Sequence, residues 1–349
     1  MSARPMSKES TVILGNHIVF TEKFFLNYEK GSNFVIITDE TVKGLWGEKL
    51  MEAFHKRGFE AFMLAFDPGE RSKNLGVYAK IVNAMGNCNV SKKTHVIGFG
   101  GGVVTDMAGF VAATFHRGMP LTLMPTTLMG VIDASIGGKN AVNSNSAKNQ
   151  VGTFYPPKIL IADCSFLTTL PLQEWYHGAS ELLKLALIQN VELFRFLEDQ
   201  PHFWVEQESL VKAIQTGVQG KIDICQHDLK EELGVRTLLN FGHTIGHALE
   251  HLSGYAMAHG EAVAKGLYWE ALLSGLDETS LSRIETILEA WGYNISIPTL
   301  SVDKWREALR HDKKGGFVRL EEIGKAVKGI APICDEDLCK LEEAHLVAK

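Results

Sequence analysis

The chain has 349 residues, of which 45% are hydrophobic and 22% are charged, and its formal net charge is -6. This composition is ordinary for a globular protein, and the length favours two domains over a single core. The acidic excess argues against a nucleic-acid partner, because such proteins concentrate lysine and arginine on one face.

The five cysteines are odd in number, and no two of them have the C-x-x-C spacing of a zinc or redox site. We therefore expect reduced thiols in a reducing compartment. No apolar run approaches the roughly 20 residues that span a bilayer. Residues 1–11 are polar and lack the apolar stretch of a secretory signal. The sequence predicts a cytoplasmic protein with no membrane partner.

The first half of the chain alternates short apolar runs with helical patterns. Its candidate strands are 34–38, 61–66, 94–99, 121–124 and 159–162. Short strands separated by helices predict a mostly parallel sheet that is covered by helices. We expect residues 1–172 to form this α/β domain.

After about residue 170, apolar residues recur at spacings of three and four, and strand-like runs become scarce. The expected helices are 174–189, 192–198, 208–225, 244–252, 261–274 and 280–290. Residues 173–349 are therefore predicted to be an all-helical domain. A cleft between two domains is a common place for a small-molecule site.

A glycine-rich segment, Gly98-Phe99-Gly100-Gly101-Gly102, follows the third candidate strand and precedes a helix expected at 104–113. Glycines at such a junction let a phosphate approach the backbone and the first amides of the helix. Asp106 is expected in the first helical turn, where it could cap the helix or meet a ribose hydroxyl. The spacing is not G-x-G-x-x-G, so a tight turn without a ligand has equal weight.

Histidines and a carboxylate in the helical half suit a metal site. His243 and His247 are four residues apart, which places both imidazoles on one face of a helix. His259 lies at a loop-to-helix junction, and Glu181 lies on a strongly apolar helix. One carboxylate with two or three imidazoles is typical of catalytic zinc. The spacing leaves open whether His243, His247 or both bind a metal, and whether Glu181 is only a capping or ion-paired residue.

Several cations lie in apolar or glycine-rich stretches instead of mixed-charge ones. They are Arg117, Lys139, Lys148, Lys184, Lys221, Arg236, Lys313 and Lys314. In an acidic chain, cations placed this way indicate a substrate with phosphate and carboxylate groups. For any single one of them, a surface position is the better explanation.

Taken in order, these motifs resemble the 3-dehydroquinate synthase family of sugar-phosphate cyclases. The resemblance covers roughly residues 34–315. Its longest segments are GGGVVTD at 100–106, DASIGGKNAVN at 133–143, RTLLNFGHT at 236–244 and HGEAV at 259–263. Shorter segments are 69–73, 115–118, 125–127, 148–149, 181–184 and 312–314.

The resemblance implies a Rossmann-like domain, residues 1–172, that binds NAD, and a helical domain, residues 173–349, that binds zinc and substrate. It implies that Glu181, His243 and His259 hold Zn2+, with Co2+ as a possible substitute. The implied NAD residues are Asp39, Glu70, Lys73, Gly101, Gly102, Val103, Val104, Thr105, Asp106, Thr126, Thr127, Lys139, Lys148, Phe166 and Thr169. The implied substrate residues are Arg117, Asp133, Lys139, Asn149, Lys184, Lys221, Arg236, Asn240, His247, Lys313 and Lys314.

The implied activity converts 3-deoxy-D-arabino-heptulosonate 7-phosphate into 3-dehydroquinate and phosphate in the shikimate pathway. Bound NAD oxidises one hydroxyl transiently, phosphate leaves, and the hydride returns. The ring then opens, and an intramolecular aldol step closes the carbocycle. NAD is regenerated in every cycle, and the substrate phosphate can itself act as the base. The family further implies a homodimer.

Two departures from the family pattern affect these expectations. Asn140 stands where the family usually has threonine, and the stretch from Lys221 to Arg236 is one residue longer than usual. Leu239, Asn240 and His247 keep the pattern of the dehydroquinate enzymes, which favours that substrate.

Three alternatives remain at this point. A metal-dependent alcohol or glycerol-phosphate dehydrogenase shares the expected architecture, but it would lack the Gly137-Gly138-Lys139 and Lys148-Asn149 elements and would accumulate NADH. A cyclase that forms an inosose or valiolone-type ring would differ only in its substrate. A binding relative without catalysis would have lost Glu181, His243, His259 or Lys139, and this chain has all four.

Overall fold

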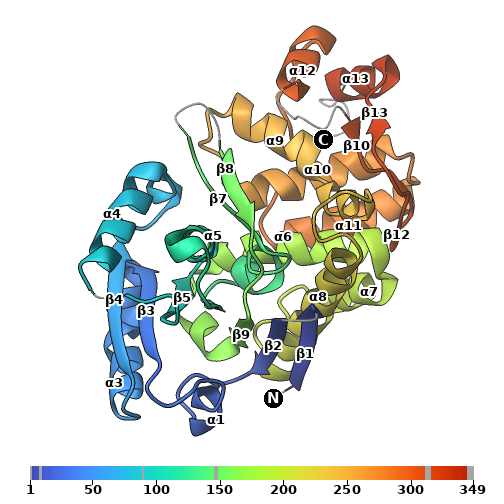
Figure 1. Cartoon of the computed structure of the whole chain (residues 1–349). Coiled ribbons are helices and arrows are strands. Elements are labelled where there is room, and N and C mark those ends of the chain that lie inside the picture. Colours follow the sequence, from blue (N-terminus) through green and yellow to red (C-terminus); the bar gives the residue numbers. More distant parts are fainter. Residues whose placement is uncertain (1, 8–9, 89, 145–147, 311–315, 344–349) are drawn as a thin grey trace. The chain divides into compact units, whose positions relative to one another are not determined.

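The computed structural model describes residues 2–7, 10–88, 90–144, 148–310 and 316–343 (Figure 1). The chain divides into two compact units, Met1–Glu174 (unit 1) and Trp175–Lys349 (unit 2). The expected domain boundary, after residue 172, falls two residues before this division and in the first turn of helix α6 (Leu172–Gln189).

Unit 1 is built on a seven-stranded sheet in the order β1-β2-β9-β6-β5-β3-β4. Its strands are β1 (Ser2–Ser7), β2 (Ser10–Gly15), β3 (Asn33–Asp39), β4 (Glu60–Phe66), β5 (His95–Gly100), β6 (Leu121–Pro125) and β9 (Ile159–Asp163). Every pairing in it is parallel except that of β1 with β2. A separate antiparallel pair joins β7 (Lys139–Val142) to β8 (Val151–Phe154).

The helices of unit 1 are α1 (Glu22–Phe25), α2 (Glu40–Val42), α3 (Glu48–His55), α4 (Leu75–Gly86) and α5 (Gly102–Thr114). Shorter helical turns are η1 (Lys43–Gly47), η2 (Glu70–Ser72), η3 (Phe115–Arg117), η4 (Gly130–Ala134) and η5 (Cys164–Thr169). Strand β3, which lies between β5 and β4, is apolar on both faces, with four consecutive residues fully buried from Phe34 to Ile37, as parallel strands between helical layers require. Helix α5 packs against β5 and β6, and Figure 1 shows it beside β5.

Unit 2 is mainly helical. Its helices after α6 are α7 (Val191–Asp199), α8 (Gln207–His227), α9 (His243–Leu252), α10 (His259–Leu273), α11 (Glu278–Ala290), α12 (Val302–Leu309) and α13 (Asp335–Glu342), with the turn η6 (Val235–Asn240). Two short antiparallel pairs join β10 (Gly316–Phe317) to β13 (Ala331–Pro332) and β11 (Leu320–Glu322) to β12 (Lys325–Ala326).

The predicted fold class, an α/β unit followed by a helical one, is confirmed. All five expected strands are present, and their ends agree with the expected ones within one residue. The prediction missed β1, β2, β7, β8, the last two helices and the strand pairs of unit 2. The strands of unit 2 have only two or three residues, which is too short to show an alternating pattern.

Glycines let the helices of unit 2 approach one another closely. A Cβ added at Gly266 on α10 would lie 1.9 Å from the carbonyl oxygen of Gly242, directly before α9. A Cβ at Gly260, in the first turn of α10, would lie 2.4 Å from the Cα of His177 on α6. Helices α6, α9 and α10 therefore meet with little side-chain bulk between them, and these three helices carry the predicted metal ligands.

The five cysteines are free thiols, as expected, and two of them, Cys164 and Cys225, are buried. Within the described ranges, no helix combines the length and the hydropathy needed to cross a membrane.

Candidate metal and cofactor site

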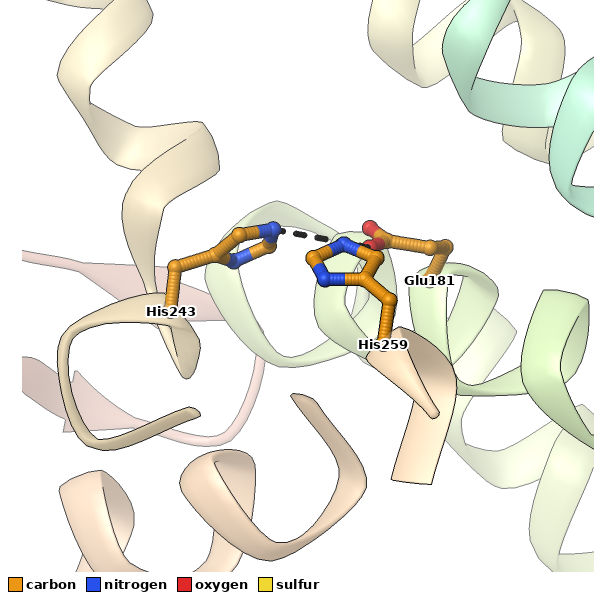
Figure 2. Close-up of side chains that lie close together, drawn as sticks. All are labelled: Glu181, His243 and His259. Carbon is orange, nitrogen blue, oxygen red and sulfur yellow. Dashed lines mark ion pairs between the residues drawn. The ribbon is translucent and has the colours of Figure 1, made fainter. Parts of the chain in front are cut away.

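Glu181, His243 and His259 converge in unit 2 (Figure 2). Nε2 of His243 lies 3.5 Å from Oε1 of Glu181, and Nε2 of His259 lies 3.6 Å from the same oxygen. The possible ligand atoms of the three residues all lie within 4.8 Å of one another. Glu181 is in the middle of α6, whereas His243 and His259 are the first residues of α9 and α10. One carboxylate and two imidazoles in this arrangement suit a catalytic zinc ion with an open position.

The second nitrogen of each of these histidines has its own acceptor. Nδ1 of His243 lies 3.1 Å from the carbonyl oxygen of Phe241, and Nδ1 of His259 lies 3.4 Å from Oε2 of Glu250. In a neutral imidazole, such an acceptor keeps the ring proton at Nδ1 and leaves the Nε2 lone pair for a metal. The sequence-derived set omits Glu250, although its spacing of three from His247 on one helix face was a signal that could have indicated it.

The carboxylate of Glu181 is 1% exposed, and neither of its oxygens accepts a hydrogen bond of ordinary geometry within the described residues. Lys184, 2% exposed, forms an ion pair with its Oε2. Burial opposes ionisation, but Lys184 and His243 hold the pKa of Glu181 well below its usual range. A buried carboxylate that is ionised and has spare acceptor capacity fits a bound cation.

The two histidines differ in charge. Burial lowers the pKa of His243, and the nearby Lys184 ammonium adds to this effect. Burial also opposes charge on His259, but the carboxylates of Glu181 and Glu250 outweigh it and raise its pKa to about 9. At neutral pH His243 is therefore neutral, the form that a metal needs, whereas His259 must release a proton to become a ligand.

Three of the predicted substrate cations are buried in unit 2. Lys184 on α6, Lys221 on α8 and Arg236 in η6 are 2%, 5% and 3% exposed. The explanation of these three as surface cations is therefore wrong. Nη1 of Arg236 donates to the carbonyl oxygen of Leu229 at 3.0 Å, and its Nε lies 3.8 Å from Oε1 of Glu231, so part of the guanidinium is held by its own loop.

His247 and Asn240 lie on either side of the ligand-bearing turn. The ring centroid of His247 is 5.5 Å from that of His243 and 6.2 Å from that of His259. Asn240 is the last residue of η6 and lies three positions before His243. The structure thus brings His247 beside the predicted metal ligands, on the same face of α9 as His243. Lys313 and Lys314 lie outside the described residues.

Four predicted residues of unit 1 belong to one polar network. Nζ of the buried Lys73 forms an ion pair with Asp106 and donates to Oδ1 of Asn149 at 2.6 Å. Asn143, which the sequence-derived set omits, donates from Nδ2 to Oε1 of Glu70 at 2.7 Å and accepts the backbone N–H of Asn149 at 2.8 Å. The expectation that Asp106 lies in the first helical turn is wrong, because α5 begins at Gly102, and Asp106 pairs with Lys73 without capping the helix.

The glycines at the junction of β5 and α5 serve two different functions. A Cβ at Gly98 would lie 2.7 Å from Cβ of Ala108, and one at Gly100 would lie 2.6 Å from Cγ2 of Val104. These two glycines are required for packing of α5 on β5. Gly101 is the N-cap of α5 and Gly102 its first residue, so the amides there are the ones that could receive a phosphate.

Other predicted NAD residues have structural contacts of their own. Asp39 caps α2, with Oδ1 accepting the N–H of Val42 at 2.9 Å. Phe166 is fully buried in the core of unit 1 and packs edge-on against Phe99, so its side chain has no free face. Val103, Val104 and Thr105 lie in α5, Thr126 is buried and Lys148 is exposed. Oγ1 of Thr127 accepts the N–H of Gly130, and Oγ1 of Thr169 accepts the Nε1–H of Trp46.

The backbone is strained at Arg117, and the turn before Lys139 depends on a glycine. Arg117 is exposed and has φ +60, directly after His116 with φ +50, a region that side chains rarely adopt. Lys139 is the first residue of β7, and its turn includes Gly138 with φ +68. Nδ2 of Asn140 donates to the carbonyl oxygens of Gly138 at 3.0 Å and Tyr155 at 2.9 Å, so this departure from the family pattern clamps the turn before Lys139. Asp133, in η4, is partly buried.

Comparison with known proteins gives a family for both units. The family described as 3-dehydroquinate synthase N-terminal matches residues 63–177, and that described as 3-dehydroquinate synthase C-terminal matches residues 178–315. The chain belongs to the 3-dehydroquinate synthase family. It is 38% identical to the 3-dehydroquinate synthase of Dehalococcoides mccartyi over 88% of this chain and 89% of that one. It is 36% identical to the enzyme of Neisseria meningitidis serogroup C over 94% of each chain.

Solved structures agree with the fold. A 2-epi-5-epi-valiolone synthase from Streptomyces hygroscopicus, described with NAD+ and Zn2+ bound, is 28% identical with a TM-score of 0.88, over 97% of this chain and 96% of that one. An iron-containing alcohol dehydrogenase has a TM-score of 0.67 at 14% identity over 98% of each chain. The fold is therefore shared with the dehydrogenase alternative, and the sequence separates the two. The expected family, enzyme class and cofactors are confirmed.

Proposed function

We propose that this chain converts 3-deoxy-D-arabino-heptulosonate 7-phosphate into 3-dehydroquinate and phosphate, the lyase reaction of its family, with NAD and Zn2+ as cofactors. The observation that carries the proposal is the convergence of Glu181, His243 and His259 beside the buried cation Lys184. It occurs in a chain that is 36–38% identical to curated 3-dehydroquinate synthases along most of its length.

The ligand set of unit 2 would hold the metal, either Zn2+ or Co2+. When bound, the metal supplies a Lewis acid that polarises a substrate oxygen, and NAD supplies a hydride acceptor that each cycle restores. Glu181 contributes the charge, and the Nδ1 contacts of His243 and His259 fix the two rings. His247 lies one turn from His243 and is placed to hydrogen-bond the same substrate group.

The buried cations would bind the anionic groups of the substrate. Lys184, Lys221 and Arg236 are withdrawn from water, and such cations form strong charge-assisted hydrogen bonds with a phosphate or carboxylate. Asn240 offers both a donor and an acceptor to a substrate hydroxyl. Arg117, Asp133, Lys139, Asn149, Lys313 and Lys314 complete the proposed substrate set.

Unit 1 would hold NAD through the junction of β5 and α5. Gly101 and Gly102 leave the first amides of α5 open to a phosphate, because neither has a side chain. Lys73, Asp106 and Glu70 lie in one hydrogen-bonded network, so a nucleotide that contacts one of them also affects the hydrogen bonds of the others. No separate protein base is needed, since the departing phosphate can accept the proton.

The proposal includes a homodimer in the cytoplasm. The support is the family resemblance and, for the compartment, the free thiols, which suit a reducing environment. Sedimentation of the purified chain tests the first part.

The deciding experiment is release of phosphate from the heptulosonate 7-phosphate, with catalytic amounts of NAD and with NADH absorbance followed in parallel. We expect stoichiometric phosphate, no net NADH, and loss of activity with a chelator that Zn2+ restores. If the chain turns over the corresponding heptulose 7-phosphate, which lacks the carboxylate, but does not turn over the heptulosonate 7-phosphate, it is another cyclase. Accumulation of NADH with a polyol phosphate would assign it to the dehydrogenases.

A further inference from the structure

The helix that begins with His243 has no capping side chain of its own. The first amides of a helix lack intrahelical acceptors, and the residue at the N-cap usually provides one. The N-cap of α9 is Gly242, in the left-handed region with φ +79. A glycine there allows the tight turn but offers no acceptor.

The acceptor comes from another helix. Glu270, near the end of α10, accepts the N–H of Gly242 at 2.7 Å through Oε2 and the N–H of Ile245 at 3.0 Å through Oε1. The two bonds bracket the turn that contains His243, so one carboxylate fixes both ends of that turn. The same turn is tied to β10, because Oγ1 of Thr244 donates to the carbonyl oxygen of Gly316 at 3.0 Å.

Glu270 is fully buried, and a buried charge is costly unless it is hydrogen-bonded. Its place at the positive end of α9 is favourable for a carboxylate. Gly266, one turn earlier on α10, lies against the carbonyl oxygen of Gly242 and lets the backbones come close enough for Glu270 to reach the amides. The glycine and the carboxylate therefore act together.

We propose that Glu270 is a positioning residue of the metal centre, which holds the first turn of α9 so that Nε2 of His243 points at Glu181. The inference rests on the metal-binding role proposed for His243. Helix α10 then has two functions: His259, its first residue, binds the metal directly, and Glu270 holds the helix that provides the other imidazole. Neither the sequence motifs nor the ligand geometry assigns Glu270 this role.

The test is the zinc affinity of Glu270→Gln, measured by competition with a chromophoric chelator. The amide keeps the size of the side chain but has one acceptor oxygen for two N–H groups. We expect a zinc dissociation constant about 10- to 100-fold higher, the usual effect of removing a group that orients a ligand. The absorption spectrum of the Co2+-loaded chain should change as well, because the geometry at His243 relaxes.

Glu198→Gln is the matched control. Glu198 is on α7 of the same unit, and its carboxylate pairs with Arg283 at 2.7 Å, away from the ligands. This variant should keep the zinc affinity and the Co2+ spectrum of the unchanged chain. If Glu270→Gln does not fold, Glu270→Asp gives the same test, because the shorter carboxylate cannot span both amides.

A double variant separates positioning from general packing. In a His243→Ala background, Glu270→Gln should weaken the residual zinc affinity by less than about 2-fold, since the residue that it positions is gone. An unchanged zinc affinity of the folded Glu270 variant, or an equal loss in the His243→Ala background, would overturn the inference. If the chain without any substitution binds no zinc, the proposed metal site itself is overturned.

Discussion

Glu181 and Lys184 form a buried ion pair within α6. The carboxylate of Glu181 therefore has two functions, which substitutions can distinguish. Glu181 is both a proposed metal ligand and the partner of a lysine that is 2% exposed. His243 is a proposed ligand as well but is not needed to neutralise a buried cation. Truncation of the two residues should therefore have the same effect on the metal and different effects on stability.

We expect Glu181→Ala and His243→Ala to bind zinc far more weakly and to lose turnover, because each removes one of three ligands. Only Glu181→Ala should also destabilise the metal-free chain, by about 3 kcal/mol, because it leaves a buried ammonium without its counter-charge. Zinc content and chemical denaturation in the presence of a chelator are the two measurements. Retained zinc in both variants would contradict the ligand assignment, and equal stabilities would contradict the role of the ion pair.

Asn143 gives a second prediction at the level of single residues, this time in unit 1. Its side chain contacts Glu70 and the backbone of Asn149, and Asn149 in turn accepts from Lys73. We expect Asn143→Ala to weaken NAD binding by about 10-fold, because two hydrogen bonds worth roughly 1 kcal/mol each no longer order the network. Calorimetric titration with NAD measures the effect, and zinc content in the same samples should not change. Loss of zinc together with NAD would indicate that the chain is merely misfolded.

Sequence reasoning found the motifs but missed the contacts that only the fold creates between them. Glu181, His243 and His259 belong to recognisable segments, and their convergence could be expected. Glu270 and Gly242 are 28 positions apart, and Asn143 and Glu70 are 73 apart. No periodicity links such pairs, because the contact exists only after α9 meets α10, or β7 meets the turn at Glu70. Spacing could also not decide whether Lys184, Lys221 and Arg236 were buried.

At the level of elements, small residues at the contacts of helices bring the site together. Gly266 and Gly242 let α10 and α9 touch at the backbone, and Gly260 does the same for α10 and α6. A bulkier residue at Gly266 or Gly260 must move a whole helix, because the nearest atom that it meets is backbone. The positions of the ligands therefore depend on residues that have no chemistry of their own.

Gly266→Ala is the corresponding prediction. Its Cβ would lie 1.9 Å from the carbonyl oxygen of Gly242, so α9 must shift. We expect a loss of at least about 2 kcal/mol of stability, of the size seen for overpacked cores, together with weaker zinc binding. Gly86→Ala, at the end of α4, is the control, since an added Cβ there meets nothing within 4 Å. Thermal unfolding compares the two, and equal melting temperatures would show that α9 and α10 tolerate separation.

The order of elements was the most predictable feature. Buried parallel strands such as β3 are continuous apolar runs, and their ends were expected within one residue. The start of α5 was expected two residues late, because glycines are poor helix formers and Gly102 joins the helix only through its place after Gly101. Pair β7–β8 was missed because Lys139–Val142 and Val151–Phe154 carry no clear alternation of apolar and polar residues.

At the level of the whole molecule, the proposed ligands of zinc lie entirely in unit 2, and the proposed contacts of NAD lie in unit 1. Each compact unit has its own core and its own set of buried charges. Binding of a ligand to the native form stabilises the part of the chain that it contacts, by about 2.7 kcal/mol at a concentration 100 times its dissociation constant. The two cofactors should consequently leave separate marks on the chain.

We expect zinc to slow amide hydrogen exchange in α6, α9 and α10, the helices that carry the ligands, and NAD to slow exchange at the junction of β5 and α5. Mass spectrometry of exchanged peptides measures both effects on one preparation. Glu181→Ala should lose the zinc-dependent protection and keep the NAD-dependent one, which excludes a nonspecific effect of the metal. Equal protection of α5 and α9 by zinc alone would contradict the separate effects of the two cofactors. It would mean that the two units open as a single cooperative body and that either cofactor stabilises the whole of it.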